Sequence, residues 1–153
     1  MTAKRVEPPR LPPAERIKTF DEIERTLPAH QAFKEAARCL FCHDAPCNKV
    51  CPVEVDVVSF IRKLKTKNFT GAIRVIREGN PLAATCARVC PQASLCEGGC
   101  AQSELAEPIA VGALQRFLAD EELKKGIAPM VPAPPTGRKV AVVGAGPAGL
   151  TCA

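Results

Sequence analysis

Eight of the nine cysteines in this chain lie between residues 39 and 100, and their spacing limits what the chain can fold into. The first four follow the pattern C-x2-C-x4-C-x3-C-P, and the last four follow C-x3-C-P-x4-C-x3-C. Similar runs in bacterial-type proteins bind iron–sulfur clusters, and there the cysteine before the proline binds the other cluster of the pair. The pattern therefore predicts a frame for two clusters. Its members are Cys39, Cys42, Cys47, Cys51, Cys86, Cys90, Cys96 and Cys100.

Disulfide bonds and zinc sites are the two other common uses of so many cysteines. Met1 leads into a proline-rich polar arm without the apolar segment of a secretory signal, and no apolar run reaches the ~18 residues of a membrane-spanning helix. We therefore expect a cytoplasmic chain with no membrane contact, in which thiols stay reduced. Four-cysteine zinc sites usually consist of two C-x2-C pairs, and only Cys39 and Cys42 form such a pair. A zinc-binding structural module is the remote alternative.

The net charge of +5 also bears on function. Two four-iron clusters bound largely by thiolates carry about three negative charges, so part of the basic surplus can compensate for buried clusters. Arg38, Lys49 and Arg88 lie near predicted ligands and suit that purpose, although ordinary solvated charge is the simpler explanation for each. The chain has no basic run with interleaved aromatic residues, so we expect no nucleic-acid binding.

The segments between the cysteines have the composition and periodicity of helices. Residues 29–41 are rich in helix formers, and Asp56 is a good N-cap for a helix over residues 57–67. Asn68 can cap a following helix that Gly79 ends, whereas residues 80–100 are expected to be irregular.

A longer helix is predicted from Pro108, a favoured first-turn residue, to Gly126. Gln115 lies on the apolar side of this helix with Val111 and Leu118. A glutamine in that position needs a hydrogen-bond partner or a metal, because an unpaired polar group is costly to bury.

A strand-like segment and a glycine-rich turn end the chain. Residues 139–143 read as a short buried parallel strand, and the G-x-G-x-x-G sequence after it is typical of a turn that opens a dinucleotide-binding helix. A single strand cannot build such a domain, so we expect the chain to be a piece of a longer protein. The residues that would contact the dinucleotide are Gly144, Gly146, Pro147, Ala148 and Gly149.

Proline-rich segments set the predicted domain boundaries. Residues 1–28 form an arm that prolines favour as extended chain, with a short helix opening at residues 19–23. A helical domain with two [4Fe-4S] clusters fills residues 29–125, a linker covers residues 126–137, and residues 138–153 begin a Rossmann-type domain. The predicted fold class is mainly α, an α-helical ferredoxin-like domain followed by the first strand and turn of an α/β domain.

Four motifs in one order carry a resemblance to a known enzyme group. They are CLFCHDAPCNKVCP, GNPLAATCARVCPQASLCEGGC, PIAVGALQRF and VAVVGAGPAGL, and the resemblance covers about residues 30–153. The chain resembles the N-terminal cluster domain shared by the glutamate synthase small subunit, dihydropyrimidine dehydrogenase, its separate NAD-dependent bacterial subunit and related flavin electron-bifurcating subunits. The cysteine spacing and the PI-x-VG-x-LQ segment sit closer to the dehydrogenase branch, with glutamate synthase as the alternative.

The resemblance implies a function, cofactors and partners. Electrons would pass from NAD(P)H to FAD, bound by two dinucleotide domains, and through two [4Fe-4S] clusters to a partner oxidoreductase subunit or domain. A hetero-oligomer is therefore expected, and this piece alone would not be catalytic.

The resemblance also implies two ligand sets that cross between the cysteine groups. One cluster would use Cys39, Cys42, Cys47 and Cys100, and the other would use Cys51, Cys90, Cys96 and the side-chain oxygen of Gln115. Cys86 is then a neighbour of the second cluster or its ligand in place of Gln115. Cys152 is expected to be a packed core thiol.

Overall fold

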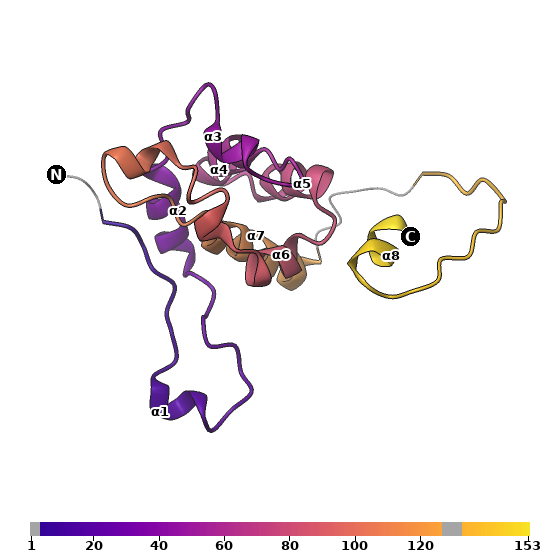
Figure 1. The fold of residues 1–153 in the computed structure, drawn as a ribbon, viewed down its shortest axis with the longest axis horizontal. Helices are drawn as coiled ribbons and strands as arrows, with labels where there is room; N and C mark the ends of the chain where they lie inside the picture. Colours follow the sequence, from indigo (N-terminus) through magenta and orange to yellow (C-terminus); the bar gives the residue numbers. More distant parts are fainter. Residues whose placement is uncertain (1–3, 127–132) are drawn as a thin grey trace.

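The computed structural model describes residues 4–126 and 133–153, and within them it is helical with no β-strand (Figure 1). Helices α2 to α7 form the body that carries the cysteines. The α-helices are α1 (Pro13–Arg16), α2 (Ala29–Ala37), α3 (Pro46–Lys49), α4 (Val57–Lys65), α5 (Phe69–Gly79), α6 (Ala83–Val89), α7 (Val111–Lys125) and α8 (Pro147–Cys152). Two 3₁₀ turns lie at Gln92–Ser94 and Ala101–Glu104.

The predicted N-caps of α4 and α5 and the end of α5 at Gly79 are confirmed, whereas α4 ends at Lys65, two residues before the predicted end. The Asp56 side chain accepts a hydrogen bond from the Ser59 N–H at 3.0 Å, and the Asn68 side chain accepts one from Gly71 at 2.9 Å. Such caps satisfy N–H groups that have no partner within the helix. The long helix ends as predicted at Gly126, which has the left-handed φ of 60°, but it begins at Val111 and not at Pro108 as expected.

The core lies where α4 and α5 pack on each other and on α2 and α7. Buried side chains of α4, including Phe60 and Leu64, meet Ile73 and Ile76 of α5 and Leu114 of α7. Burial of each such side chain stabilises the fold by about 1.5–3 kcal/mol. At one end, the rings of Phe33, Phe69 and Phe117 pack edge to face or tilted, with centroids 6.0–6.5 Å apart.

Two expectations about local structure are wrong. Residues 83–89 form α6, which corrects the expectation that residues 80–100 are irregular, because AATCARV contains good helix formers and packs along α7. Residues 19–23 are not helical, and the arm instead has one helical turn at α1, which begins with Pro13.

The arm doubles back on itself, so its start and end run side by side (Figure 1). An antiparallel bridge joins Arg10 and Glu24, with the Leu11 N–H donating to the Ile23 carbonyl at 2.9 Å. This pairing uses the backbone groups that a helix at residues 19–23 would need.

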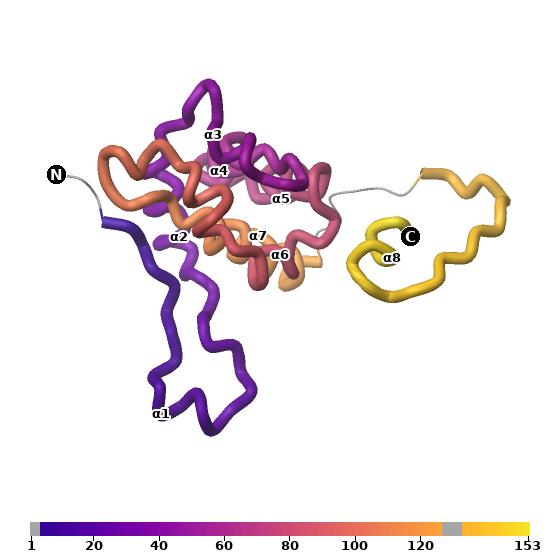
Figure 2. The backbone as a smooth tube through the Cα atoms, in the orientation of Figure 1, coloured from indigo at the N-terminus to yellow at the C-terminus, as the bar shows by residue number. Residues whose placement is uncertain are grey.

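The predicted Rossmann strand is absent from the described residues. Residues 139–143 are exposed irregular chain, seen as a winding trace in Figure 2, because a strand needs neighbouring strands for its backbone groups. The turn and helix after it do form: Gly144 has φ 110°, and α8 begins at Pro147. Cys152 is exposed, contrary to the expected core thiol, because no sheet covers α8 in the described part of the chain.

Candidate cluster-binding sites

The structure brings the cysteines together in two groups that do not follow sequence order. Cys39 follows α2 and Cys47 lies in α3, and Cys100, from a distant loop, lies beside both. Burial, and then the neighbouring Cys100 and Cys42 thiolates, raise the pKa of Cys39. Burial and the thiolates of Cys100 and Cys39 raise the pKa of Cys47 to about 11. Four soft donors are therefore close enough to repel one another as anions.

The second group consists of the remaining four cysteines of the pattern. Burial, and then the Cys86 and Cys51 thiolates, raise the pKa of Cys90. Burial raises the pKa of Cys96 to about 12, with Glu97, Cys90 and Cys51 adding to the effect. A bound positive metal centre removes such repulsion, because thiolates are its ligands.

A cavity of about 500 Å³ gathers the second group. Its polar lining consists of four cysteines, Asn80, Gln92 and Gln115, and the rest of its wall is apolar, with Val53, Val55, Val57, Val89 and Leu95 among others. Soft thiolates in an apolar pocket are the donors and surroundings that iron–sulfur clusters need. The predicted ligands and ligand candidates among the lining residues are Cys51, Cys86, Cys90, Cys96 and Gln115.

Gln115 reaches this cavity from α7 with its amide already oriented. Its Nε2 donates to the Ala83 carbonyl at 3.1 Å, at the start of α6. The amide nitrogen has only N–H donors to offer, so the carbonyl oxygen, which has two lone pairs, is the atom that could bind a metal. Cys86 lines the same cavity, so both candidates for the eighth ligand lie where a cluster would be.

The loops that carry the cysteines have unusual backbone conformations. Phe41 and Ala45, neither of them glycine, have left-handed φ values of 54° and 41°. This conformation costs roughly 1–2 kcal/mol per residue, and it turns N–H groups inward toward a bound anion. The Phe41 backbone hydrogen bond to the Cys39 thiol is an example, and it partly offsets the raised pKa of that thiol.

Asn48 is a positioning residue whose contacts the sequence analysis missed. Its Oδ1 accepts a hydrogen bond from the Val57 N–H at 2.8 Å, and its Nδ2 donates to Asp56 at 2.9 Å. Asn48 thereby ties the residue after Cys47 to the start of α4. The only signal in the sequence is an asparagine near a predicted N-cap.

Two of the three arginine and lysine residues expected to balance cluster charge have carboxylate partners instead. The Arg38 guanidinium donates to Glu35 at 2.6 Å, with both side chains buried, and Arg88 pairs with Glu22 and Asp120. Burial of the Arg38 charge is tolerated because it has such a partner.

The described part of the chain gives no support to a single-ion site. No three of its His, Cys, Asp and Glu side chains are grouped so that they could hold one metal ion. Zinc would need its donors about 2.0–2.3 Å from one centre. The wider grouping of the cysteines suits a cluster of several atoms.

Comparison with known proteins identifies the class. Residues 16–127 match the family described as dihydropyrimidine dehydrogenase domain II, 4Fe-4S cluster, and the chain belongs to this family. It is an iron–sulfur domain of the oxidoreductase type, with a role in electron transfer, and the match agrees with the dehydrogenase branch of the resemblance.

Particular relatives are bacterial subunits. The chain is 48% identical over 131 residues to the NAD-dependent dihydropyrimidine dehydrogenase subunit PreT of Escherichia coli (strain K12) and to that of Salmonella typhimurium. The alignment covers 86% of this chain and 32% of each relative, so the chain spans about a third of their length. Among the described helices, none is long and apolar enough to cross a membrane.

Proposed function

We propose that this chain is the electron-transfer part of an NAD(P)H-dependent flavin and iron–sulfur oxidoreductase, most like the NAD-dependent dihydropyrimidine dehydrogenase subunit. The observation that carries the proposal is the presence of two clusters of cysteine side chains. Each cluster is assembled from segments that lie far apart in the sequence. Family membership supports the four-iron cofactor, and the 48% identity supports the dehydrogenase type.

The ligand sets are part of the proposal. The first cluster is held by Cys39, Cys42, Cys47 and Cys100, which lie together. The second is held by Cys51, Cys90, Cys96 and the Oε1 atom of Gln115, which line one cavity. The hydrogen bond from Gln115 Nε2 to Ala83 supports Gln115 as a ligand, because it holds the side-chain amide at the cavity.

When bound, the clusters take up and pass on single electrons. The chain's own residues hold the thiolates, exclude water with the apolar wall of the second cavity, and direct backbone N–H groups such as that of Phe41 to sulfur. Hydrogen bonds to sulfur and limited solvent access set the potential of such clusters.

The remaining parts of the activity belong to the longer protein. FAD and NAD(P)H bind in dinucleotide domains, of which the first begins at the Gly144 to Gly149 turn. A partner subunit or domain in the cytoplasm accepts the electrons within a hetero-oligomer. The turn at Gly144 supports this placement, because it is followed by a helix that begins at Pro147.

Metal analysis of the anaerobically purified chain tests the proposal. We expect a brown protein with broad absorption near ~400 nm and about eight iron and eight acid-labile sulfide per chain. A colourless chain that contains zinc and no iron would refute the electron-transfer role and support the structural alternative.

A further inference from the structure

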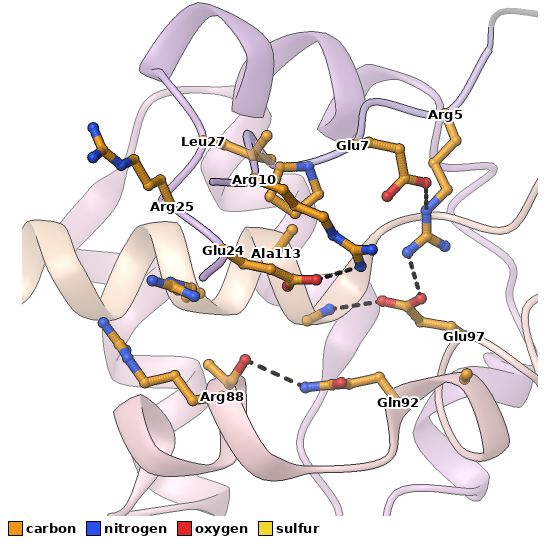
Figure 3. A pocket seen from close by; sticks show the side chains of 15 residues that line it. Arg5, Glu7, Arg10, Glu24, Arg25, Leu27, Arg88, Gln92, Glu97 and Ala113 are labelled. Atoms are coloured by element: carbon orange, nitrogen blue, oxygen red, sulfur yellow. Dashed lines mark hydrogen bonds and ion pairs between the residues drawn. The ribbon is translucent and has the colours of Figure 1, made fainter. Parts of the chain in front are cut away.

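A buried carboxylate beside the second cysteine group has no role in the ligand sets above. Glu97 directly follows Cys96, and its side chain is 9% exposed. Its Oε1 accepts a hydrogen bond from the Gly112 N–H at 3.0 Å, and its Oε2 accepts one from the Arg5 guanidinium at 2.7 Å. Figure 3 shows Glu97 between Arg5 and the first turn of α7. The loop that carries Cys96 is thus bonded directly to α7.

The segment that follows Cys90 packs against the same turn of α7. Gln92 donates through Nε2 to the carbonyl of Cys86, in the middle of α6, at 3.2 Å. Its side chain packs against Gly112 so closely that a Cβ on Gly112 would lie 2.7 Å from the Gln92 Cδ. A side chain at position 112 would displace the end of the Gln92 side chain. Both cysteine-bearing segments therefore meet α7 at one residue.

Gln115 lies three residues after Gly112, about one helical turn away. We infer that Glu97 is the positioning residue of the second cluster, which sets Cys96 and Gln115 at a fixed separation by bonding the Cys96 loop to the turn before Gln115. This inference rests on the proposed function, and it assigns Glu97 no direct contact with the cluster.

The start of α7 has a second buried carboxylate besides Glu97. Glu35, which is fully buried, accepts a hydrogen bond from the Ala110 N–H at 2.9 Å and from the Val6 N–H at 2.8 Å. The positive end of the helix dipole therefore keeps one buried anion when Glu97 is replaced. Replacement of Glu97 should then affect binding of the second cluster and leave the first cluster unchanged.

The two clusters of one chain provide an internal control for the test. Glu97→Ala and Glu97→Gln are compared with Glu104→Ala, which removes the same charge from an exposed residue nearby. Iron and sulfide content, EPR of the dithionite-reduced chain and a redox titration are measured for each, under anaerobic conditions.

We expect Glu97→Ala to lose up to about four iron per chain, with the EPR signal of one cluster lost or altered and the other unchanged. Glu97→Gln keeps an acceptor for Gly112 and loses the charge. It should retain both clusters and shift one midpoint potential to a more positive value, because a nearby negative charge is gone. Glu104→Ala should match the unmodified chain.

Three results would overturn the inference: unchanged signals and potentials in both variants, equal loss of both clusters, or an equal effect of Glu104→Ala. A chain that binds no iron before any substitution contradicts the proposed function instead, so the two failures can be told apart.

Discussion

At the scale of single residues, the cysteine loops are held in place by polar side chains in which both terminal polar atoms form hydrogen bonds. Asn48 uses both ends of its amide at the start of α4, and Glu97 divides its two oxygens between Gly112 and Arg5. Each of these hydrogen bonds orients a segment next to a proposed ligand. A side chain whose two terminal polar atoms are both hydrogen-bonded can adopt few other rotamers.

Two matched variants, Gln115→Ala and Cys86→Ala, identify which residue is the eighth cluster ligand. We expect Gln115→Ala to lower iron content from about eight toward four per chain and to remove one EPR signal, because the second cluster loses its fourth ligand. Cys86→Ala should leave both quantities unchanged. The reverse pattern, with Cys86→Ala losing a cluster and Gln115→Ala silent, would assign Cys86 as the ligand.

The strained Ala45 backbone gives a stability prediction. Because φ at Ala45 is 41°, Ala45→Gly should raise the free energy of unfolding by up to about 1 kcal/mol, since glycine adopts this region without a Cβ clash. Urea denaturation of the iron-loaded chain measures it. Ala84→Gly, inside α6, is the control and should lower stability by about 0.5–1 kcal/mol. A loss of stability in Ala45→Gly would show that the left-handed conformation carries no strain.

At the scale of elements, ion pairs attach the arm to the helical body. Asp120 on α7 accepts hydrogen bonds from Thr26 of the arm and from Arg88 of α6, and Arg88 also pairs with Glu22 of the arm. One carboxylate thus joins three segments. Replacement of Asp120 should loosen the arm more than the cysteine loops, because those loops have separate hydrogen bonds to α4 and α7.

Acid should weaken this attachment. Burial by itself would raise the pKa of Asp120, but the hydrogen bonds from Thr26 and Arg88 outweigh it and hold the pKa below the ordinary 3.8. A carboxylate with a lowered folded-state pKa contributes stability above the unfolded value and loses it as pH falls through the folded one.

We therefore expect the free energy of unfolding to fall as pH drops below about 4, and to fall less in Asp120→Asn. Asp21→Asn, at an exposed position in the arm, is the control and should follow the unmodified chain. Identical pH profiles for Asp120→Asn and the unmodified chain would show that this ion pair adds nothing to stability.

At the scale of the whole molecule, the two proposed clusters join segments that lie far apart in the chain. Cys100 meets the loop after α2, and Cys51 meets α6 and the turn after it. The cavity of about 500 Å³ lies between the segments of the second group. Metal binding is therefore coupled to the folding of the body, as it is when ligands come from distant parts of a chain.

Removal of iron should lower the melting temperature. We expect a drop of at least about 5 °C after anaerobic chelation, which corresponds to roughly 1 kcal/mol for a domain of this size. Differential scanning calorimetry of the loaded and chelated chain measures it, and reconstitution with iron and sulfide should restore the original value. An unchanged melting temperature would mean that the helices hold the cysteine loops without metal.

Local features are predictable because they depend on neighbours in the chain. Asp56 and Asn68 cap the helices expected of them, and Gly126 ends the last long helix, since each acts on residues within one turn. The cysteine spacing likewise indicates clusters, because the type of donor belongs to the residue itself. Helix α6 escapes prediction because its cysteine and proline surroundings suggest only a loop.

The amino-acid sequence by itself thus determined the chemistry of the donors and the positions of several helix ends. Only the tertiary structure decided which distant groups meet: Cys100 with Cys47, Glu97 with Gly112, and Arg88 with Asp120. It also decided that residues 139–143 form no strand. The physical reason is the same throughout, because hydrogen bonds, ion pairs and ligand sets between remote segments depend on packing that no local pattern encodes.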